Sequence, residues 1–171
     1  ILSAPAVWGR DAMPWFQRSL LWLAAHTVPG MTLTGRGLDI EPSDNHDMLR
    51  ALGRDPLVIK ATRVDAIYGL VDLMDAALAA ASVLNKPALI LYGARDEVIE
   101  AGPTRLMIKR LPAGMTEKQR IAVYSDGYHM LLRDLQAKAV WTDIAHWASD
   151  PRAPLPSGAD QFGDAFFAAE K

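Results

Sequence analysis

The sequence predicts an α/β fold in which parallel strands are flanked by helices and a helical insertion precedes most of the core. Two short, largely apolar runs, Ala88–Tyr92 and Arg120–Tyr124, are each followed by a helical pattern. The first run is bordered by proline and glycine, which is typical of a strand that is buried on both faces, as in parallel sheets. Two consecutive strand and helix steps with short loops predict parallel strands joined by right-handed crossovers.

The composition indicates one soluble, folded domain. Half of the 171 residues are hydrophobic, which is enough for a packed core. The 18 basic and 20 acidic residues are dispersed, so the net charge of -2 gives no footprint for nucleic acid. The absence of cysteine removes disulfides and thiolate chemistry. The most apolar runs, Ser19–Ala25 and Ala76–Leu84, are shorter than the roughly 18 to 20 residues that span a bilayer. The compartment stays open, with a cytoplasmic location as the expectation.

Four segments follow from the order of the elements. Residues 1–9 resemble the end of a core strand and its exit loop, without an initiating Met or a charged leader, so we expect the protein to begin upstream. Residues 10–84 form the helical insertion. Residues 85–150 form the core that contains the two strands. Residues 151–171 form a tail that begins with several prolines.

The insertion begins with an amphipathic helix. Asp11 can cap this helix, Pro14 lies in its first turn, and Val28-Pro29-Gly30 ends it. Residues 31–42 show no sustained period and are predicted to be irregular.

Two more helices are expected in the insertion. The first is capped by Ser43 or Asp44, runs to Leu52 and should end at a left-handed Gly53. The second, from about Thr62 to Ser82, has the strongest helical pattern of the chain, because apolar residues recur at three- and four-residue steps. These residues are Val64, Ile67, Tyr68, Val71, Met74 and Leu78.

Two helices complete the core. One contains Pro103 in its first turn and ends near Pro112, and the other has Leu135 to Trp147 as its apolar side. In the tail, residues 161–171 are expected to be either a short docked helix or disordered.

The residues with catalytic potential follow the two strands. Asp96 lies in the turn after the first strand, and His129 lies in the loop after the second. Because the carboxyl ends of parallel strands converge at one edge of a sheet, the two side chains should be neighbours. A carboxylate that accepts the Nδ1 proton of an imidazole fixes its tautomer, and it stabilises the imidazolium that forms when Nε2 takes a proton from a nucleophile. The two residues therefore predict an acid and base dyad, which needs a nucleophile to form a catalytic triad.

Other interpretations of single residues stay open. Asp96 alone could be an ordinary turn cap, and Asp126 or Asp134 could replace it as the partner of His129. His46, which lies between Asp44 and Asp47, could bind a metal, although a solvated helix face is the more common role. We expect no metal and no cofactor. We expect no catalytic or binding role for two other histidines, His26 and His146. The glycine-rich turn Gly35-Arg36-Gly37 lacks the preceding strand that a phosphate-binding loop requires.

Four segments resemble the monoacylglycerol lipase and lysophospholipase branch of the α/β-hydrolases. They are Leu2–Pro5, Asp55–Leu57, Pro87–Asp96 and Tyr124–His129, and the resemblance extends from Ile1 to about Trp147. It implies the C-terminal part of an α/β-hydrolase fold with a helical lid at residues 10–84. It also implies that Asp96 is the acid and His129 the base of a catalytic triad.

The same resemblance implies that the nucleophilic serine lies before Ile1. In this fold the order along the chain is nucleophile, acid, histidine, and the serine lies in a G-x-S-x-G turn. No serine of this chain is in such a setting, so we expect the 171 residues alone to be inactive. The complete protein would form an acyl-enzyme from a carboxylic ester such as a monoacylglycerol or a lysophospholipid.

Two alternatives remain, and the expected partners follow from the main interpretation. The nucleophile could be an aspartate, as in dehalogenases and epoxide hydrolases, or the fold could be a non-catalytic binding module. The expected partners are an apolar ester substrate, the N-terminal half of the same protein and, transiently, a membrane surface. No nucleic acid is expected.

Overall fold

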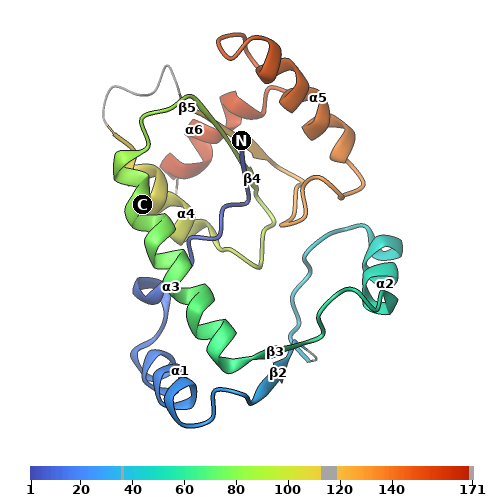
Figure 1. Ribbon diagram of the computed structural model, residues 1–171. Coiled ribbons are helices and arrows are strands. Elements are labelled where there is room, and N and C mark those ends of the chain that lie inside the picture. Colours follow the sequence, from blue (N-terminus) through green and yellow to red (C-terminus); the bar gives the residue numbers. More distant parts are fainter. Residues whose placement is uncertain (36, 113–118, 170–171) are drawn as a thin grey trace.

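The computed structural model describes residues 1–35, 37–112 and 119–169, and its centre is a parallel sheet (Figure 1). The strands β1 (Leu2–Ser3), β4 (Ala88–Gly93) and β5 (Gln119–Tyr124) lie in the order β1-β4-β5. All neighbours are parallel, and Ile90 of β4 pairs with both Leu2 and Ile121. The parallel arrangement predicted from the two strand and helix steps is confirmed.

The central strand β4 is buried along its whole length, as its apolar sequence predicts. Alternate side chains of a strand point to opposite faces of the sheet. Accordingly, Leu89 and Leu91 pack into one apolar cluster, and Ile90 packs into another on the opposite face.

Different helices supply the two clusters. The cluster around Leu89 includes Val140 of α5 (Ala137–Ser149) and Leu131 of the preceding loop. The cluster around Ile90 includes Leu78 of α3 (Val64–Ala80), Ala81 of the short 3-10 helix η2 (Ala81–Val83) and Met107 of α4 (Ala101–Arg110). The sheet is thus covered on both faces.

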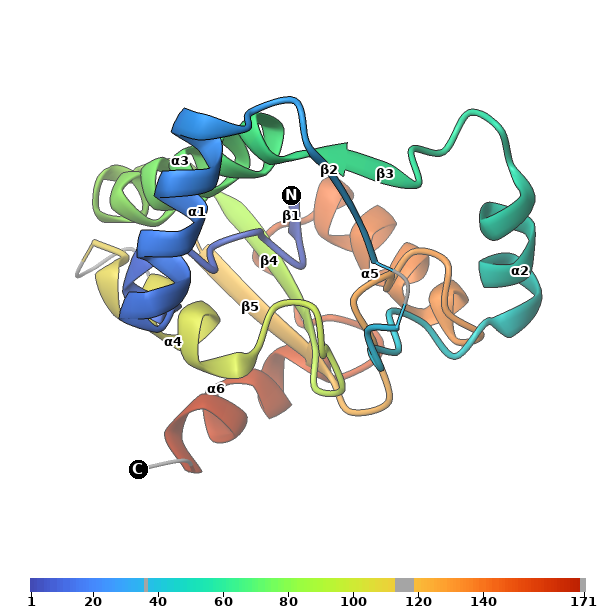
Figure 2. The same cartoon turned by 90° about the horizontal axis from the view of Figure 1, so that it is seen from below.

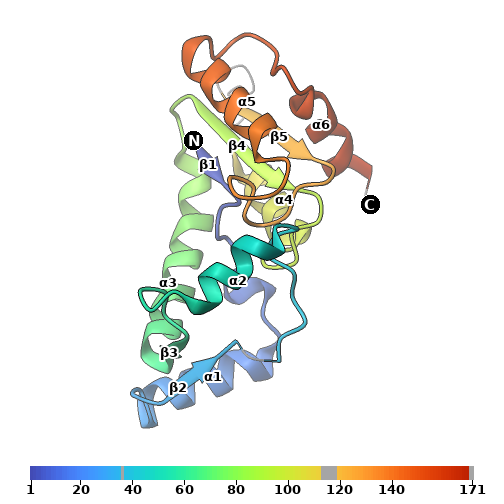
Figure 3. The same cartoon turned by 90° about the vertical axis from the view of Figure 1, so that its right-hand side faces the viewer.

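The tail ends in a docked helix, α6 (Ala159–Ala169), which lies along β5 on the side away from β4 (Figure 3). A Cβ on Gly163 would lie 2.8 Å from the carbonyl oxygen of Ile121, so the helix backbone directly contacts the strand backbone. Of the two expectations for residues 161–171, docking holds for those that the structure describes.

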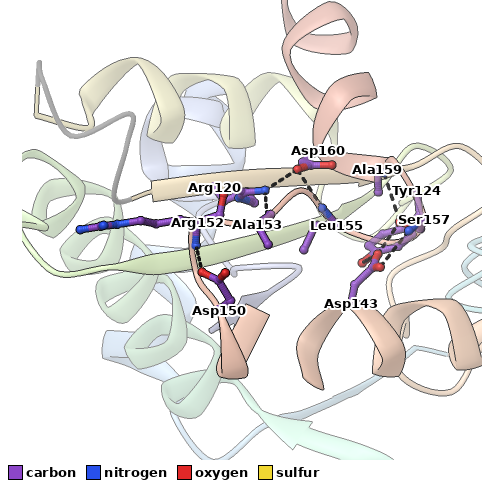
Figure 4. Close-up of polar contacts among 10 residues, drawn as sticks. All are labelled: Arg120, Tyr124, Asp143, Asp150, Arg152, Ala153, Leu155, Ser157, Ala159 and Asp160. Atoms are coloured by element: carbon purple, nitrogen blue, oxygen red, sulfur yellow. Dashed lines mark hydrogen bonds and ion pairs between the residues drawn. The ribbon is translucent and has the colours of Figure 1, made fainter. Parts of the chain in front are cut away.

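A polar network joins this tail to the core (Figure 4). The buried Asp143 accepts hydrogen bonds from the Tyr124 hydroxyl (2.9 Å) and from both the backbone N–H (3.1 Å) and the hydroxyl of Ser157. Arg120 of β5 forms a 2.6 Å ion pair with Asp160 of α6. The residues after α5 are therefore held to the sheet by both polar and apolar contacts.

Residues 10–84 contain the three expected helices, namely α1 (Trp15–Thr27), α2 (His46–Arg54) and α3, after a short 3-10 helix, η1 (Arg10–Ala12). Helix α3 runs from the sheet to the far end of the molecule (Figure 1), and α1 lies across it while α2 lies apart from both (Figure 2).

Four details of this segment differ from the sequence prediction. Asp11 does not cap α1 but lies in η1, and the N-cap of α1 is Pro14, without a side-chain cap. Residues 31–42 are not wholly irregular, because β2 (Thr32–Thr34) pairs antiparallel with β3 (Ala61–Arg63). Both strands are three residues long and exposed on both faces, so they produce no alternating pattern. The cap of α2 is Asn45, whose side chain accepts from the Met48 N–H. Gly53 lies inside α2 without a positive φ, so it is no left-handed terminator.

One helical stretch, Val64–Val83, is long and apolar enough to cross a membrane when only length and composition are considered. It exceeds the apolar runs recognised in the sequence. In the structure its Leu78 is buried against the sheet, and its Asp72 and Asp75 form ion pairs with Arg10. These contacts join the stretch to the rest of the domain, while 17% of its apolar window is buried.

Candidate active site

The loops that follow β4 and β5 are in direct backbone contact. The N–H of Ala94 donates to the carbonyl of Tyr124, and the N–H of Arg95 donates to the carbonyl of Gly127, each over 2.9 Å. A Cβ on Gly93 would lie 2.5 Å from the carbonyl oxygens of Gly127 and Tyr128. The absence of a side chain at Gly93 is therefore what allows the two loops to approach so closely.

This contact brings the two predicted residues together. His129 Nδ1 donates to Asp96 Oδ2 over 2.9 Å. The other carboxylate oxygen, Oδ1, accepts from the N–H groups of Val98 (2.9 Å) and Ile99 (2.8 Å). The Asp96 side chain is fully buried, whereas that of His129 is 28% exposed. The carboxylate is thus held by three donors and orients the imidazole, whose Nδ1 is the donor in this pair.

The two rival aspartates have other partners. Asp126 forms an ion pair with Arg95, and Asp134 accepts from the Ser43 hydroxyl (2.5 Å) and the Tyr128 N–H (2.8 Å). Asp96 is therefore the carboxylate that contacts His129, as loop geometry at the strand ends predicts.

Arg95 is a residue near the site that the sequence interpretation missed. Besides Asp126, it contacts the Tyr128 hydroxyl at 3.5 Å, and its guanidinium carbon lies 5.9 Å from the centroid of the Tyr128 ring. The hydrogen bond to Tyr128 and the charge of Asp126 raise the pKa of Arg95. It joins the two loops on their exposed side, which only the turn geometry reveals.

The remaining candidates show no catalytic arrangement. The Nδ1 of His26 lies 2.7 Å from the Trp22 carbonyl, and the His26 ring stacks on that of Trp22. His46 lies 3.5 Å from Glu41 on the surface. His146 is half-buried in α5 and contributes to no described site. Among residues 1–35, 37–112 and 119–169, no group of three potential metal ligands converges.

A cavity of about 530 Å³ lies next to the site but is not lined by Asp96 or His129. Its walls come from the 125–127 turn, α5 and the start of α6. We place the candidate chemistry at the Asp96–His129 pair rather than in this cavity, because the pair has the geometry of an acid-base dyad.

The sequence of the chain matches a known protein family over most of its length. The family described as serine aminopeptidase, S33, matches residues 1–136. The chain belongs to this family of α/β-hydrolases. The match includes both Asp96 and His129.

The relatives that match this chain include lipases. A monoacylglycerol lipase of Mycolicibacterium smegmatis is 25% identical over 158 residues, which cover 86% of this chain and 51% of the relative. The crystal structure of a Paleococcus ferrophilus monoacylglycerol lipase matches with a TM-score of 0.70 and 24% identity, over 85% of this chain and 56% of that one.

A second solved structure shows the same fold. A soluble variant of a Saccharomyces cerevisiae monoglyceride lipase, in complex with a substrate analog, gives a TM-score of 0.66 at 17% identity, over 86% of this chain and 54% of that one. The chain thus spans about half the length of these relatives.

Proposed function

We propose that this chain is the C-terminal part of a serine hydrolase that cleaves carboxylic esters, with Asp96 as the acid and His129 as the base. The observation that carries this proposal is the 2.9 Å hydrogen bond between a fully buried carboxylate and a partly exposed imidazole at adjacent strand ends. Membership of the hydrolase family and the likeness to monoacylglycerol lipases support it.

In the proposed reaction, His129 accepts and then donates one proton in each of two half-reactions, acylation and deacylation. Nε2 takes the proton of a serine hydroxyl as the serine oxygen bonds to the ester carbonyl carbon. The resulting imidazolium then donates that proton to the leaving alcohol, and the acyl-enzyme remains. His129 next takes a proton from water, which attacks the acyl-enzyme, and returns it to the serine oxygen as the acid leaves. Asp96 stays ionised and stabilises the imidazolium.

The nucleophile in this proposal is a serine outside the 171 residues. Six of the seven serines of this chain donate to other groups. Ser43 and Ser157 donate to buried aspartates, Ser125 donates to Asp126, and three more donate to carbonyls of their own helices or turns, namely Ser19, Ser82 and Ser149. Within the part of the chain that the structure describes, no serine hydroxyl is hydrogen-bonded to His129. The usual order of the fold, with the nucleophile first, supports a serine upstream of Ile1.

We further propose that residues 10–84 form a lid and that the substrate has an apolar chain, as in a monoacylglycerol or a lysophospholipid. Helix α1 exposes several large apolar side chains, and Trp15 is 74% exposed. Its other exposed apolar residues are Phe16, Leu20, Trp22 and Leu23. Such a surface suits an acyl chain or transient contact with a membrane surface. The lipases among the relatives support this substrate class.

The test uses the protein that contains this chain together with the residues that precede it. A fluorophosphonate probe should label one serine, and short-chain esters of 4-nitrophenol should be hydrolysed. His129→Ala and Asp96→Asn should lower kcat by roughly 10⁴-fold, because each disrupts the proton relay. The control is Asp126→Asn, which changes a neighbouring carboxylate that pairs with Arg95 instead and should keep activity within about threefold.

Each alternative predicts a different result. An aspartate nucleophile would give turnover of a haloalkane or an epoxide without fluorophosphonate labelling. A non-catalytic module would show neither labelling nor turnover that depends on His129. Either outcome would overturn the proposed ester hydrolase.

A further inference from the structure

A second buried carboxylate, Asp134, lies five positions after His129 and is distinct from the dyad. It is 6% exposed, and it accepts from the Tyr128 N–H at 2.8 Å and from the Ser43 hydroxyl at 2.5 Å. Tyr128 directly precedes His129, so one carboxylate oxygen holds the Gly127–Tyr128 peptide, which lies one residue before the imidazole. Ser43, fully buried, belongs to the segment that precedes α2.

The segment that contains Ser43 is bound to the same loops at several other points. We call residues 41–45 the lid root, on the basis of the lid proposed above. Four further hydrogen bonds join it to the residues after β4 and β5. They are Glu41 N–H to Glu97 Oε2 (2.8 Å), Met130 N–H to the Pro42 carbonyl (2.9 Å), Leu135 N–H to Asp44 Oδ1 (2.8 Å) and Asn45 Nδ2 to the Arg133 carbonyl (2.9 Å).

Asp134 contacts both the lid root, through the Ser43 hydroxyl, and the loop of the candidate dyad, through the Tyr128 N–H. Loss of its side chain would remove the acceptor from the Tyr128 N–H and leave the Ser43 hydroxyl without its buried partner. Of the other bonds of the lid root, the one from the Met130 N–H to the Pro42 carbonyl reaches the peptide that follows His129. The remaining three end on Glu97, Arg133 and Leu135, so Asp134 is the member of the five that joins the lid root to the backbone before His129.

We propose that Asp134 is a positioning residue of the proposed reaction, which couples the lid root to the backbone N–H of Tyr128, the residue that precedes His129. The inference rests on the proposed ester hydrolysis and deepens it. A catalytic group that is misplaced by about 1 Å can lose roughly 10²-fold in rate. Asp134 therefore acts on the rate through His129, without contact to substrate.

The experiment compares three variants of the full-length protein. Asp134→Ala should lower kcat by about tenfold or more and change KM less than about twofold, because it displaces the base rather than a substrate contact. Asp134→Asn should recover kcat to within about threefold, since its amide oxygen can accept from Tyr128 N–H and its amide nitrogen can donate to Ser43.

Asp143→Ala is the matched control. Asp143 is also buried and also accepts from a serine hydroxyl and a backbone N–H, but those belong to Ser157. It should lower the melting temperature as much as Asp134→Ala and leave kcat unchanged at a temperature where both variants are folded. Equal kcat losses in the two alanine variants, or no recovery in Asp134→Asn, would overturn the positioning role.

A second readout does not depend on turnover. In hydrogen exchange, the amides of Tyr128 and Met130 should exchange faster in Asp134→Ala than in the wild type, and unchanged exchange would contradict the inference. If Asp134→Ala does not fold, Ser43→Ala removes only the lid-root donor and should lower kcat in the same direction. A wild-type protein without labelling or hydrolysis would defeat the proposed function, while the exchange measurement would still test Asp134.

Discussion

At the scale of single residues, Gly93 sets the distance between the two loops that carry the candidate dyad. Its Cα faces the backbone of Gly127 and Tyr128, where a methyl group would overlap two carbonyl oxygens at 2.5 Å. Backbone atoms that are already hydrogen-bonded to each other cannot move apart without breaking those bonds.

The prediction for Gly93→Ala is a loss of stability of about 1–3 kcal/mol or more, because the loops must separate. Gly69→Ala is the control, since Gly69 lies inside α3 and a Cβ there meets no atom within 4 Å. This second change should stabilise the protein by about 0.5–1 kcal/mol through helix propensity. Urea unfolding of both variants checks the opposite signs, and equal effects would contradict the steric argument.

Tyr124 gives a prediction about alkaline pH. Burial and the hydrogen bond to Asp143 raise the pKa of Tyr124 above its ordinary value of 10.0. Above about pH 10 the phenol loses its proton in the unfolded chain but keeps it in the folded chain, so the free energy of unfolding should fall as pH rises. Tyr124→Phe should have a shallower fall between pH 9 and 11 in urea titrations. Parallel curves for the two proteins would refute this assignment.

The sequence was informative about residues whose position follows from strand ends. Asp96 and His129 could be predicted as neighbours because each directly follows a buried strand. Arg95 and Asp134 could not be assigned in the same way, because their partners depend on how the 125–135 loop folds back onto the turn after β4. Turn geometry of this kind leaves no periodic signal.

At the scale of elements, burial and length decided what could be predicted. The strand β4 and the helix α3 have long or uniform apolar patterns, and both lie where the sequence predicts. The pair β2 and β3 was missed because three exposed residues per strand carry no alternation. Leu135, predicted on the last helix, lies before α5 and is exposed, because that helix begins only at Ala137.

Two leucines of α3 allow a test of which face of this helix is packed. Leu78 is 4% exposed within the cluster around Ile90, whereas Leu73 is 68% exposed. Leu78→Ala should cost about 2–5 kcal/mol through lost burial and a cavity. Leu73→Ala should stay within about 0.5 kcal/mol. Denaturant unfolding measures both, and a larger cost at Leu73 would mean that the packed face has been assigned wrongly.

At the scale of the whole molecule, the parts of the sheet differ in how well they are covered. The two faces of the sheet are covered, yet β1 is two residues long and lies at one edge with Ile1 and Leu2 exposed. Exposed apolar edges favour association with another chain or segment.

The corresponding prediction concerns assembly. The isolated 171-residue chain should sediment above its monomer mass of 18.7 kDa in analytical ultracentrifugation. Co-expression with the upstream polypeptide that we propose should give a uniform species, because that polypeptide would cover β1. A concentration-independent monomer of the isolated chain would argue against this view of the edge.

The position of α6 has a consequence for how the sheet can be extended. With Gly163 pressed against the backbone of Ile121, new strands have no room to join beside β5. The described sheet can therefore be extended by further strands next to β1, the strand at its other edge, but not next to β5. Engineers who wish to append a reporter or split the protein should therefore treat the β5 side as closed and the β1 side as the docking flank.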